Sequence, residues 1–171
     1  MGDITIKQVP TSVITKRKTN NLDMMIYTSF KKLSHNPKLS HNLDEIGRLL
    51  GSPNSVLVVV NKLNNPNNPT NPNKTRLCAY LLGEVKKLND GRNVFFITYI
   101  YVSGQMRAHG IGNKLLAKAE SICKEKNLSG IMLICDTSDS FVLNWYQNKG
   151  YMEDLYLRNY SRYDVFFKDV F

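Results

Sequence analysis

The stretch of sequence that decides the fold is residues 93–127, NVFFITYIYVSGQMRAHGIGNKLLAKAESICKEKN. Its first ten residues are mostly β-branched or aromatic, which is typical of a buried β-strand. The loop of residues 103–112 follows and contains three glycines. Beyond it, apolar residues recur at the spacing of one helical face, at Leu115, Leu116, Ala119 and Ile122. The stretch therefore predicts a strand, a glycine-containing loop and an amphipathic helix in direct succession.

On the N-terminal side, the same kinds of pattern predict a strand, two helices and two further strands. The Asn and Pro repeats of residues 64–75 favour turns and cannot continue a strand, so we expect them to form the long loop of a hairpin. The predicted elements are a strand at 3–8, helices at 22–33 and 42–51, and strands at 55–63 and 76–87.

On the C-terminal side, the pattern predicts a strand at 130–136, a helix at 139–149 and strands at 151–157 and 162–170. The order of elements is β-α-α-β-β-β-α-β-α-β-β. Hairpin strands around one β-α-β crossover predict an α/β fold whose mixed, mostly antiparallel sheet has about six to seven strands and helices on both faces. A chain of 171 residues is long enough for one core, so we expect a single domain over residues 1–171.

Composition excludes several classes of protein. No apolar run approaches the roughly 20 residues that span a bilayer, and the N-terminus MGDITIKQVP lacks the features of a signal peptide. We therefore expect a soluble, intracellular, cytoplasmic protein. The three histidines lack metal-ligand spacing, so we predict no metal. Buried free thiols, rather than disulfides, are predicted at Cys78, Cys123 and Cys135.

The formal net charge of +9 favours a negatively charged partner: nucleic acid, a membrane surface or a phosphorylated cofactor. The basic cluster at residues 16–18 is too short and too poor in aromatic residues to indicate a nucleic-acid site. A helix N-terminus preceded by glycines attracts phosphate, because it exposes unpaired N–H groups and a partial positive charge. The run Arg107-Ala108-His109-Gly110-Ile111-Gly112 has this arrangement and predicts a site for a pyrophosphate.

Two common nucleotide motifs do not match this loop. The Walker A motif requires Gly-Lys-Ser/Thr, whereas Gly112 is followed by Asn113, Lys114 and Leu115, so no hydroxyl is available for magnesium. The dinucleotide fingerprint requires a third glycine at the position of Leu115. Both motifs are therefore excluded.

Arg107-x-x-Gly110-x-Gly112, preceded by Tyr101-Val102-Ser103 on a strand, resembles the acetyl-CoA loop of the GNAT superfamily of N-acetyltransferases. A second signature of that family resembles the run Trp145-Tyr146-Gln147-Asn148-Lys149-Gly150-Tyr151. The order of elements is also similar over nearly the whole chain. The resemblance implies the GNAT fold, acetyl-CoA as co-substrate, and a parallel strand pair, residues 93–102 and 130–136, that splays apart to admit it.

The resemblance also implies which residues contact the cofactor. Backbone groups on the strand would pair with the pantetheine arm, and the loop amides would bind the pyrophosphate. Arg107 and His109 would add charge near the phosphates, unless Arg107 instead packs over the loop. The implied cofactor-binding residues are Ile100, Tyr101, Val102, Arg107, Ala108, His109, Gly110, Ile111, Gly112, Asn113 and Tyr146.

The implied reaction is direct acetyl transfer to a primary amine in a ternary complex. Tyr146 is the implied proton donor to the departing thiolate, because a phenol is protonated at neutral pH. Relatives often place a carboxylate on the strand before the loop, where this chain has none. The general base is therefore Glu84, Asp136 or Tyr99, or none is needed. Asp139 occupies a position where relatives often have Asn.

The acceptor amine is left open by the sequence. Residues 156–160 resemble a hairpin with which peptide acetyltransferases bind a peptide, which slightly favours a protein or peptide amine over a small molecule or polyamine. Phe96 and Ile134 are the nearest candidates to complete such a site.

Two alternatives to an acetyltransferase remain: a non-catalytic acyl-CoA-binding module, and a basic nucleic-acid-binding domain. Exposed strand edges would also allow a homodimer.

Overall fold

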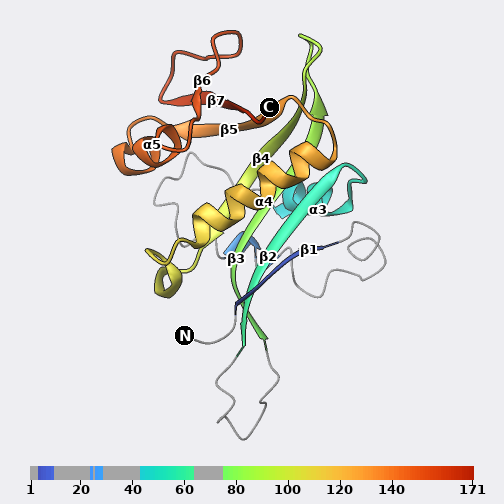
Figure 1. Ribbon diagram of the computed structural model, residues 1–171, viewed down its shortest axis with the longest axis vertical. Coiled ribbons are helices and arrows are strands. Elements are labelled where there is room, and N and C mark those ends of the chain that lie inside the picture. Colours follow the sequence, from blue (N-terminus) through green and yellow to red (C-terminus); the bar gives the residue numbers. More distant parts are fainter. Residues whose placement is uncertain (1–3, 10–23, 25, 29–42, 64–74) are drawn as a thin grey trace, which may run out of the picture. The chain divides into compact units, whose positions relative to one another are not determined.

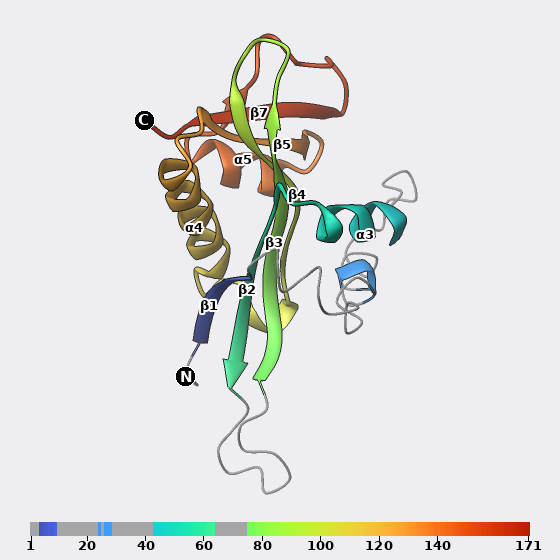
Figure 2. The same ribbon diagram turned by 90° about the vertical axis from the view of Figure 1, so that its right-hand side faces the viewer.

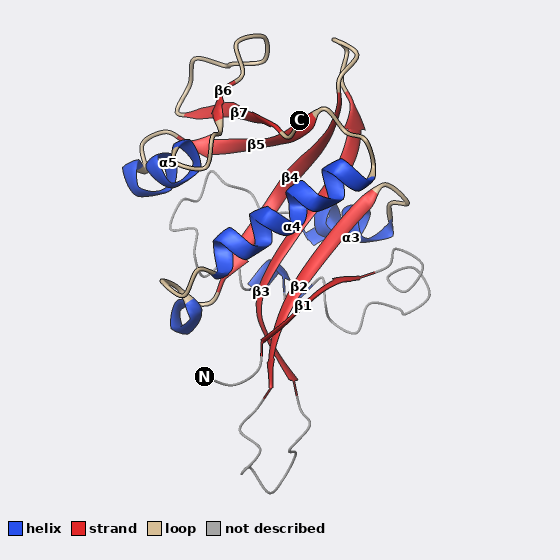
Figure 3. Cartoon of the chain, in the orientation of Figure 1, coloured by secondary structure: helices blue, strands red, loops and turns tan. Residues whose placement is uncertain are grey.

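The computed structural model describes residues 4–9, 24, 26–28, 43–63 and 75–171. Most of the predicted helix at 22–33 lies outside these residues, although Met24 and residues 26–28 are helical. The predicted loop at 64–75 also lies almost entirely outside them. The elements are β1 (Ile4–Val9), α3 (Leu43–Gly51), β2 (Ser55–Leu63), β3 (Thr75–Lys87), β4 (Asn93–Val102), the 3-10 helix η1 (Gly104–Met106), α4 (Ile111–Glu125), β5 (Gly130–Asp136), α5 (Ser140–Gln147), β6 (Met152–Glu153) and β7 (Tyr163–Asp169) (Figures 1 and 3).

Seven strands form one sheet in the order β1-β2-β3-β4-β5-β7-β6. β1 and β2 are antiparallel, as are β5 and β7 and also β6 and β7, whereas β4 and β5 are parallel. This confirms the predicted mixed, mostly antiparallel sheet with one parallel pair. No helix among the described residues is long and apolar enough to cross a bilayer.

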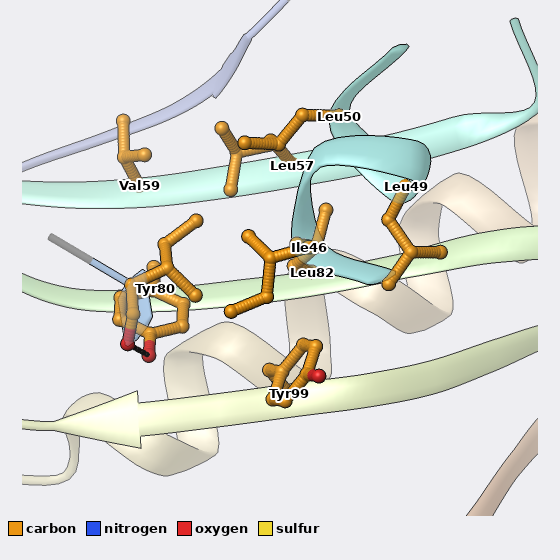
Figure 4. Close-up of a cluster of buried hydrophobic side chains, with 9 residues drawn as sticks. Ile46, Leu49, Leu50, Leu57, Val59, Tyr80, Leu82 and Tyr99 are labelled. Carbon is orange, nitrogen blue, oxygen red and sulfur yellow. Dashed lines mark hydrogen bonds between the residues drawn. The ribbon is translucent and has the colours of Figure 1, made fainter. Parts of the chain in front are cut away.

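The chain divides into two compact units, of which the first comprises Met1–Gly83 and Tyr99–Leu115. In this unit α3 lies on one side of β2 and β3 (Figure 2) and buries its apolar face against them. The Tyr80 hydroxyl is buried but donates a hydrogen bond to the Ile26 carbonyl at 3.1 Å. The side chains that meet in this core, shown in Figure 4, are Ile46, Leu49, Leu50, Leu57, Val59, Tyr80, Leu82 and Tyr99.

The second unit comprises Glu84–Thr98 and Leu116–Phe171. Val94, Met132 and Val165, from three neighbouring strands, form a buried cluster on one face of its part of the sheet.

The three cysteines of the chain are free and buried, which confirms the prediction for them. Burial raises the pKa of the Cys123 thiol to about 12 and that of Cys135 to about 11, so both stay protonated at neutral pH.

Between two hydrogen bonds that join them, the β4 side of the β3–β4 hairpin contains one residue more than the β3 side. Leu88 N–H donates to the Arg92 carbonyl at one end of the hairpin, and Ser103 N–H donates to the Cys78 carbonyl at the other. Between these bonds β3 advances ten residues, from 78 to 88, while β4 advances eleven, from 92 to 103. An extra residue on one strand is a β-bulge, which bends the strand and interrupts pairing. The pairing of β4 with β5 accordingly runs only from Val94 to Ile97.

Two predictions about element bounds are corrected by the structure. The expected strand at 151–157 is only two residues long, because Asp154 accepts hydrogen bonds from the N–H groups of Tyr156 at 3.0 Å and Leu157 at 3.1 Å. These bonds turn the chain away from the sheet. The helix after the glycine-containing loop begins at Ile111, two residues earlier than expected, and this places Ile111 and Gly112 in its first turn.

Candidate active site

The loop of residues 103–110, here called the cofactor loop, joins β4 to α4. Ser103 ties its start to β3 through the bond to the Cys78 carbonyl at 2.9 Å. The 3-10 turn η1 follows, and the Met106 side chain is buried beneath it. The first half of the loop is therefore fixed by backbone hydrogen bonds and one apolar anchor, independently of any ligand.

The second half of the cofactor loop turns sharply. Ala108 has φ of 60° and Gly110 has φ of 72°, both in the left-handed region, which glycine adopts freely and alanine adopts with strain. Arg107 Nε donates to the Val102 carbonyl at 3.1 Å, and His109 Nδ1 lies 2.6 Å from the Arg107 carbonyl. Since a carbonyl can only accept, His109 Nδ1 carries the hydrogen. The Arg107 side chain thus folds back over the loop, which was one of the two arrangements expected for it.

These turns leave a row of backbone donors at the start of α4. The N–H groups of residues 108–112 have no acceptor among the residues that the structure describes. Ile111 and Leu115 are buried and anchor the helix, so the donors are held in a fixed position. A Cβ at Gly110 would meet nothing within 4 Å, so the space beside the loop is open. A pyrophosphate fits this arrangement, because it needs several N–H donors at the positive end of a helix dipole.

The strand before the loop offers backbone groups of its own. Ser103 N–H faces β3, and successive residues of a strand direct their N–H and C=O groups to alternate sides. Ile100 and Val102 therefore direct theirs away from β3, whereas Tyr101 directs its own toward β3. Tyr101 instead contributes its ring, which stacks on Tyr80 with centroids 5.4 Å apart. Of the three strand residues expected to pair with pantetheine, two have their backbone groups on the available side.

Tyr146 lies near the end of α5, in the second unit. Asp139 Oδ1 accepts from Val142 N–H at 3.1 Å and caps this helix. The Tyr146 side chain is buried, with 5% of the residue exposed, and its ring lies 4.8 Å from Trp145 and 5.4 Å edge-on from Tyr151. Burial, together with nearby Cys135, raises the pKa of Tyr146 above its ordinary value. The phenol is therefore fully protonated at neutral pH and positioned by ring contacts.

The three candidates for the general base differ in their surroundings. Arg162 donates two hydrogen bonds to Asp136, at 2.9 and 2.7 Å, and with Ser138 holds the pKa of that carboxyl well below its usual range. Tyr99 is buried, and burial raises the pKa of its phenol. Asp136 is thus too weak a base, and Tyr99 is not ionised at neutral pH.

Glu84 is the remaining candidate. It is a buried carboxylate on β3, 7% exposed, and pairs with Lys86 at 2.9 Å. Lys86 was not singled out from the sequence, although alternation along a strand places residues two apart on the same face. Among the residues that the structure describes, no three His, Cys, Asp or Glu side chains lie close enough to hold a metal ion.

Residues 72–155 match the model of the acetyltransferase (GNAT) family. This segment includes the cofactor loop, the parallel strand pair and Tyr146. The match covers just under half of the chain and shows that this segment is similar to GNAT acetyltransferases.

Among curated proteins, the uncharacterized protein YxbD of Bacillus subtilis (strain 168) is 35% identical over 86 residues. The match covers 45% of this chain and 54% of that protein, so it spans about half of the relative's length.

Among solved structures, a GNAT-family protein from Desulfovibrio desulfuricans superimposes with a TM-score of 0.70 and 10% identity, covering 99% of this chain and 100% of that chain. The NatC complex bound to Gag peptide and CoA has a TM-score of 0.67 and 17% identity, with 96% of both chains covered. At such low identity, these likenesses show the GNAT fold.

Proposed function

We propose that the protein transfers an acetyl group from acetyl-CoA to a primary amine by direct attack within a ternary complex. The observation that carries this proposal is the row of N–H donors of residues 108–112 at the start of α4. Such a row has one obvious use, which is to bind a diphosphate. The family match supports the same co-substrate.

In this proposal the cofactor loop and β4 bind the co-substrate together. The loop amides bind the pyrophosphate, and the backbone groups of Ile100 and Val102 pair with the amides of the pantetheine arm as an additional strand would. The Val102 carbonyl already accepts from Arg107, so its remaining lone pair is the one available. Bound acetyl-CoA supplies an acetyl group activated as a thioester.

Transfer forms a C–N bond to the acceptor and breaks the C–S bond of the thioester. Tyr146 donates its phenolic proton to the departing sulfur, so that CoA leaves as a thiol. Its raised pKa keeps this proton available throughout the neutral and mildly alkaline range. Glu84 accepts a proton from the acceptor ammonium, which leaves the nitrogen lone pair free to attack. As the amide forms, the attacking nitrogen loses a second proton, which replaces the one that Tyr146 gave to the sulfur. Glu84 is assigned this role because its partner Lys86 is partly exposed and can be displaced, whereas Arg162 holds Asp136 with two hydrogen bonds and Tyr99 is neutral.

We propose a protein or peptide amine as the slightly favoured acceptor, with a small-molecule amine or a polyamine as the alternatives. The NatC structure is bound to a peptide, and residues 156–160 of this chain resemble a peptide-binding hairpin. Free cysteines fit a reducing compartment, so we place the reaction inside the cell. β1 and β6 end the strand order, so either edge could pair with a second copy of the chain.

The test combines calorimetry with CoA and a thiol-release assay with acetyl-CoA and a panel of primary amines. Tyr146→Phe should lower turnover more than about tenfold and leave CoA affinity within about twofold. Because the pKa of Tyr146 is raised, its protonation should not cause turnover to decline on the alkaline side below about pH 10.

Tyr151→Phe is the matched control. The Tyr151 hydroxyl is buried without a hydrogen-bond partner among the described residues, so removing it costs no bond and keeps the ring beside Tyr146. Equal turnover of Tyr146→Phe and the wild type would remove Tyr146 from the proposed role. CoA binding without thiol release for any amine would instead indicate the non-catalytic module, and an absence of CoA binding would overturn the assignment of the loop.

A further inference from the structure

Three neighbouring strands of the second unit form a continuous apolar face. Phe96 on β4 is opposite Met132 on β5, which in turn is opposite Phe167 on β7. Val94, Met132 and Val165 are buried in one cluster, with Phe96 and Phe167 packed against it. These residues define what we call the apolar face; the three strands that carry them, β4, β5 and β7, are labelled in Figure 1.

Ile134 extends the apolar face beyond the point where β4 and β5 pair. It lies two residues after Met132, so it is on the same face, and it is opposite Val165. The pairing of β4 with β5 ends at Leu133, one residue earlier. Met132 and Val165 are buried, whereas Ile134 is 53% exposed. The fold thus presents one large apolar side chain to solvent, one residue beyond the point where the pairing of β4 with β5 ends.

Glu84 borders the same face on its other side. Leu88 N–H donates to the Arg92 carbonyl across the β3–β4 turn, so these two residues lie opposite each other. In an antiparallel pair, four residues before Leu88 lie opposite four residues after Arg92, which places Glu84 opposite Phe96. Lys86, two residues from Glu84, has its ammonium 4.5 Å from the centroid of the Phe96 ring, which confirms that these side chains share a face. A carboxylate and an apolar surface therefore lie on neighbouring strands, about 4.8 Å apart in the sheet.

The charges around the apolar face argue against a multiply charged acceptor. Glu84 already pairs with Lys86, and Asp136, two residues beyond Ile134, already pairs with Arg162. Each of these two carboxylates thus has a basic partner before any acceptor binds. Lys86 is 42% exposed on its side chain, so one acceptor ammonium can take its place, but a polyamine would meet Lys86 and Arg162 as repelling charges.

We propose that the acceptor is a monoamine whose nitrogen is attached next to an apolar group, such as a peptide or amide that begins with leucine or phenylalanine. Glu84 receives the ammonium, and the apolar group packs on Phe96 and Ile134. This inference rests on the proposed function, because it takes the end of the β4–β5 pairing as the place where the thioester meets the acceptor.

The test compares kcat/KM for glycinamide, leucinamide, phenylalaninamide and spermidine at saturating acetyl-CoA. The wild type should prefer leucinamide to glycinamide by about tenfold, since full burial of one methylene is worth roughly a factor of four and the four-carbon leucine side chain would be only partly buried on this face. Ile134→Asn should reduce this ratio at least about threefold. Phe171→Asn, which alters another exposed apolar residue of the same unit beyond the end of β7, should retain it.

The outcomes separate the inference from the proposed function. Equal rates for all four amines, a preference for spermidine, or an unchanged ratio in a folded Ile134→Asn variant would overturn the inference while acetyl transfer stands. CoA binding with no acetylation of any amine would overturn the proposed function. A short peptide that begins with leucine, tested beside leucinamide, distinguishes a polypeptide from a small-molecule source of the amine, and a preference for either over glycinamide supports the inference.

Discussion

Two loops of the molecule differ in which groups accept hydrogen bonds from their backbone N–H groups. In residues 154–162, here called the C-terminal loop, the chain supplies its own anions. Asp154 accepts from the N–H groups of Tyr156 and Leu157, and Asp164 accepts from Asn159 at 2.7 Å. Both carboxylates are buried. Three backbone donors of this loop, those of Tyr156, Leu157 and Asn159, are therefore satisfied by the protein's own carboxylates.

The cofactor loop carries no such carboxylate. Its turns come from two left-handed residues, Ala108 and Gly110, and the donors of residues 108–112 have no acceptor among the described residues. In the proposed function the anion that completes them is the pyrophosphate of the co-substrate. Under this proposal, backbone N–H groups of the C-terminal loop obtain their acceptors when the chain folds. Those of the cofactor loop obtain theirs when a ligand binds. Substitutions in the first should change stability, and substitutions in the second should change binding.

The largest effect is expected where the internal anion is removed. Asp154→Ala removes a buried carboxylate that accepts from two backbone N–H groups and from the Arg92 guanidinium, so the free energy of unfolding should fall by about 3 kcal/mol. Urea denaturation measures this loss. Burial by itself would raise the pKa of Asp154, but Arg92 and the two amides lower it below its ordinary value, so the carboxylate is ionised and its full contribution is present at pH 7.

Asp139→Ala is the control for this variant. Asp139 also accepts from a backbone N–H, but it is an exposed helix cap, so its loss should cost only about 1 kcal/mol. CoA affinity of Asp154→Ala should equal that of the wild type. Equal losses of stability in the two variants would show that the buried carboxylate does not organise the C-terminal loop.

The two loops also differ in how far the sequence predicted them. The glycines and the helix start of the cofactor loop follow from local patterns, because left-handed turns and helix caps depend on neighbouring residues. The first part of the C-terminal loop was wrongly predicted to be a strand, because apolar and polar residues alternate in part of YMEDLYL. The hydrogen bonds to Asp154 that turn the chain form only in the folded structure.

The features of the site that sequence reasoning missed depend on pairing between strands. Individual strands, such as β2 and β5, could be predicted from the β-branched residues within them. The bulge in β4, in contrast, is defined by the register against β3, and nothing within residues 93–102 marks the extra residue. The position of Glu84 beside Phe96 follows from the same register, which is why the general base stayed open among three candidates.

The second effect tests whether the cofactor loop depends on its left-handed turn. Gly110→Val places a β-branched residue at φ of 72°, a conformation that costs a non-glycine residue about 1–2 kcal/mol, although its Cβ would meet no neighbour. The loop should relax away from the binding geometry, and the Kd for CoA should rise at least about tenfold by calorimetry. Gly104→Ala is the matched control, because Gly104 also has open space around its Cβ position but no positive φ, and its affinity should stay within about twofold.

The smallest effect concerns Ala108, the other left-handed residue of the cofactor loop. At φ of 60° alanine carries a strain of about 1 kcal/mol that glycine would not, but glycine loses roughly 0.5–1 kcal/mol more conformational entropy on folding. The two terms nearly cancel, so Ala108→Gly should change the free energy of unfolding by about 0.5 kcal/mol or less and shift Tm by no more than about 2 °C. The Kd for CoA should likewise stay within about twofold, because the same N–H groups remain in place. A loss of CoA affinity comparable to that of Gly110→Val would mean that the alanine methyl group itself stabilises the cofactor loop. The cofactor loop would then depend on its own side chains, as the C-terminal loop does.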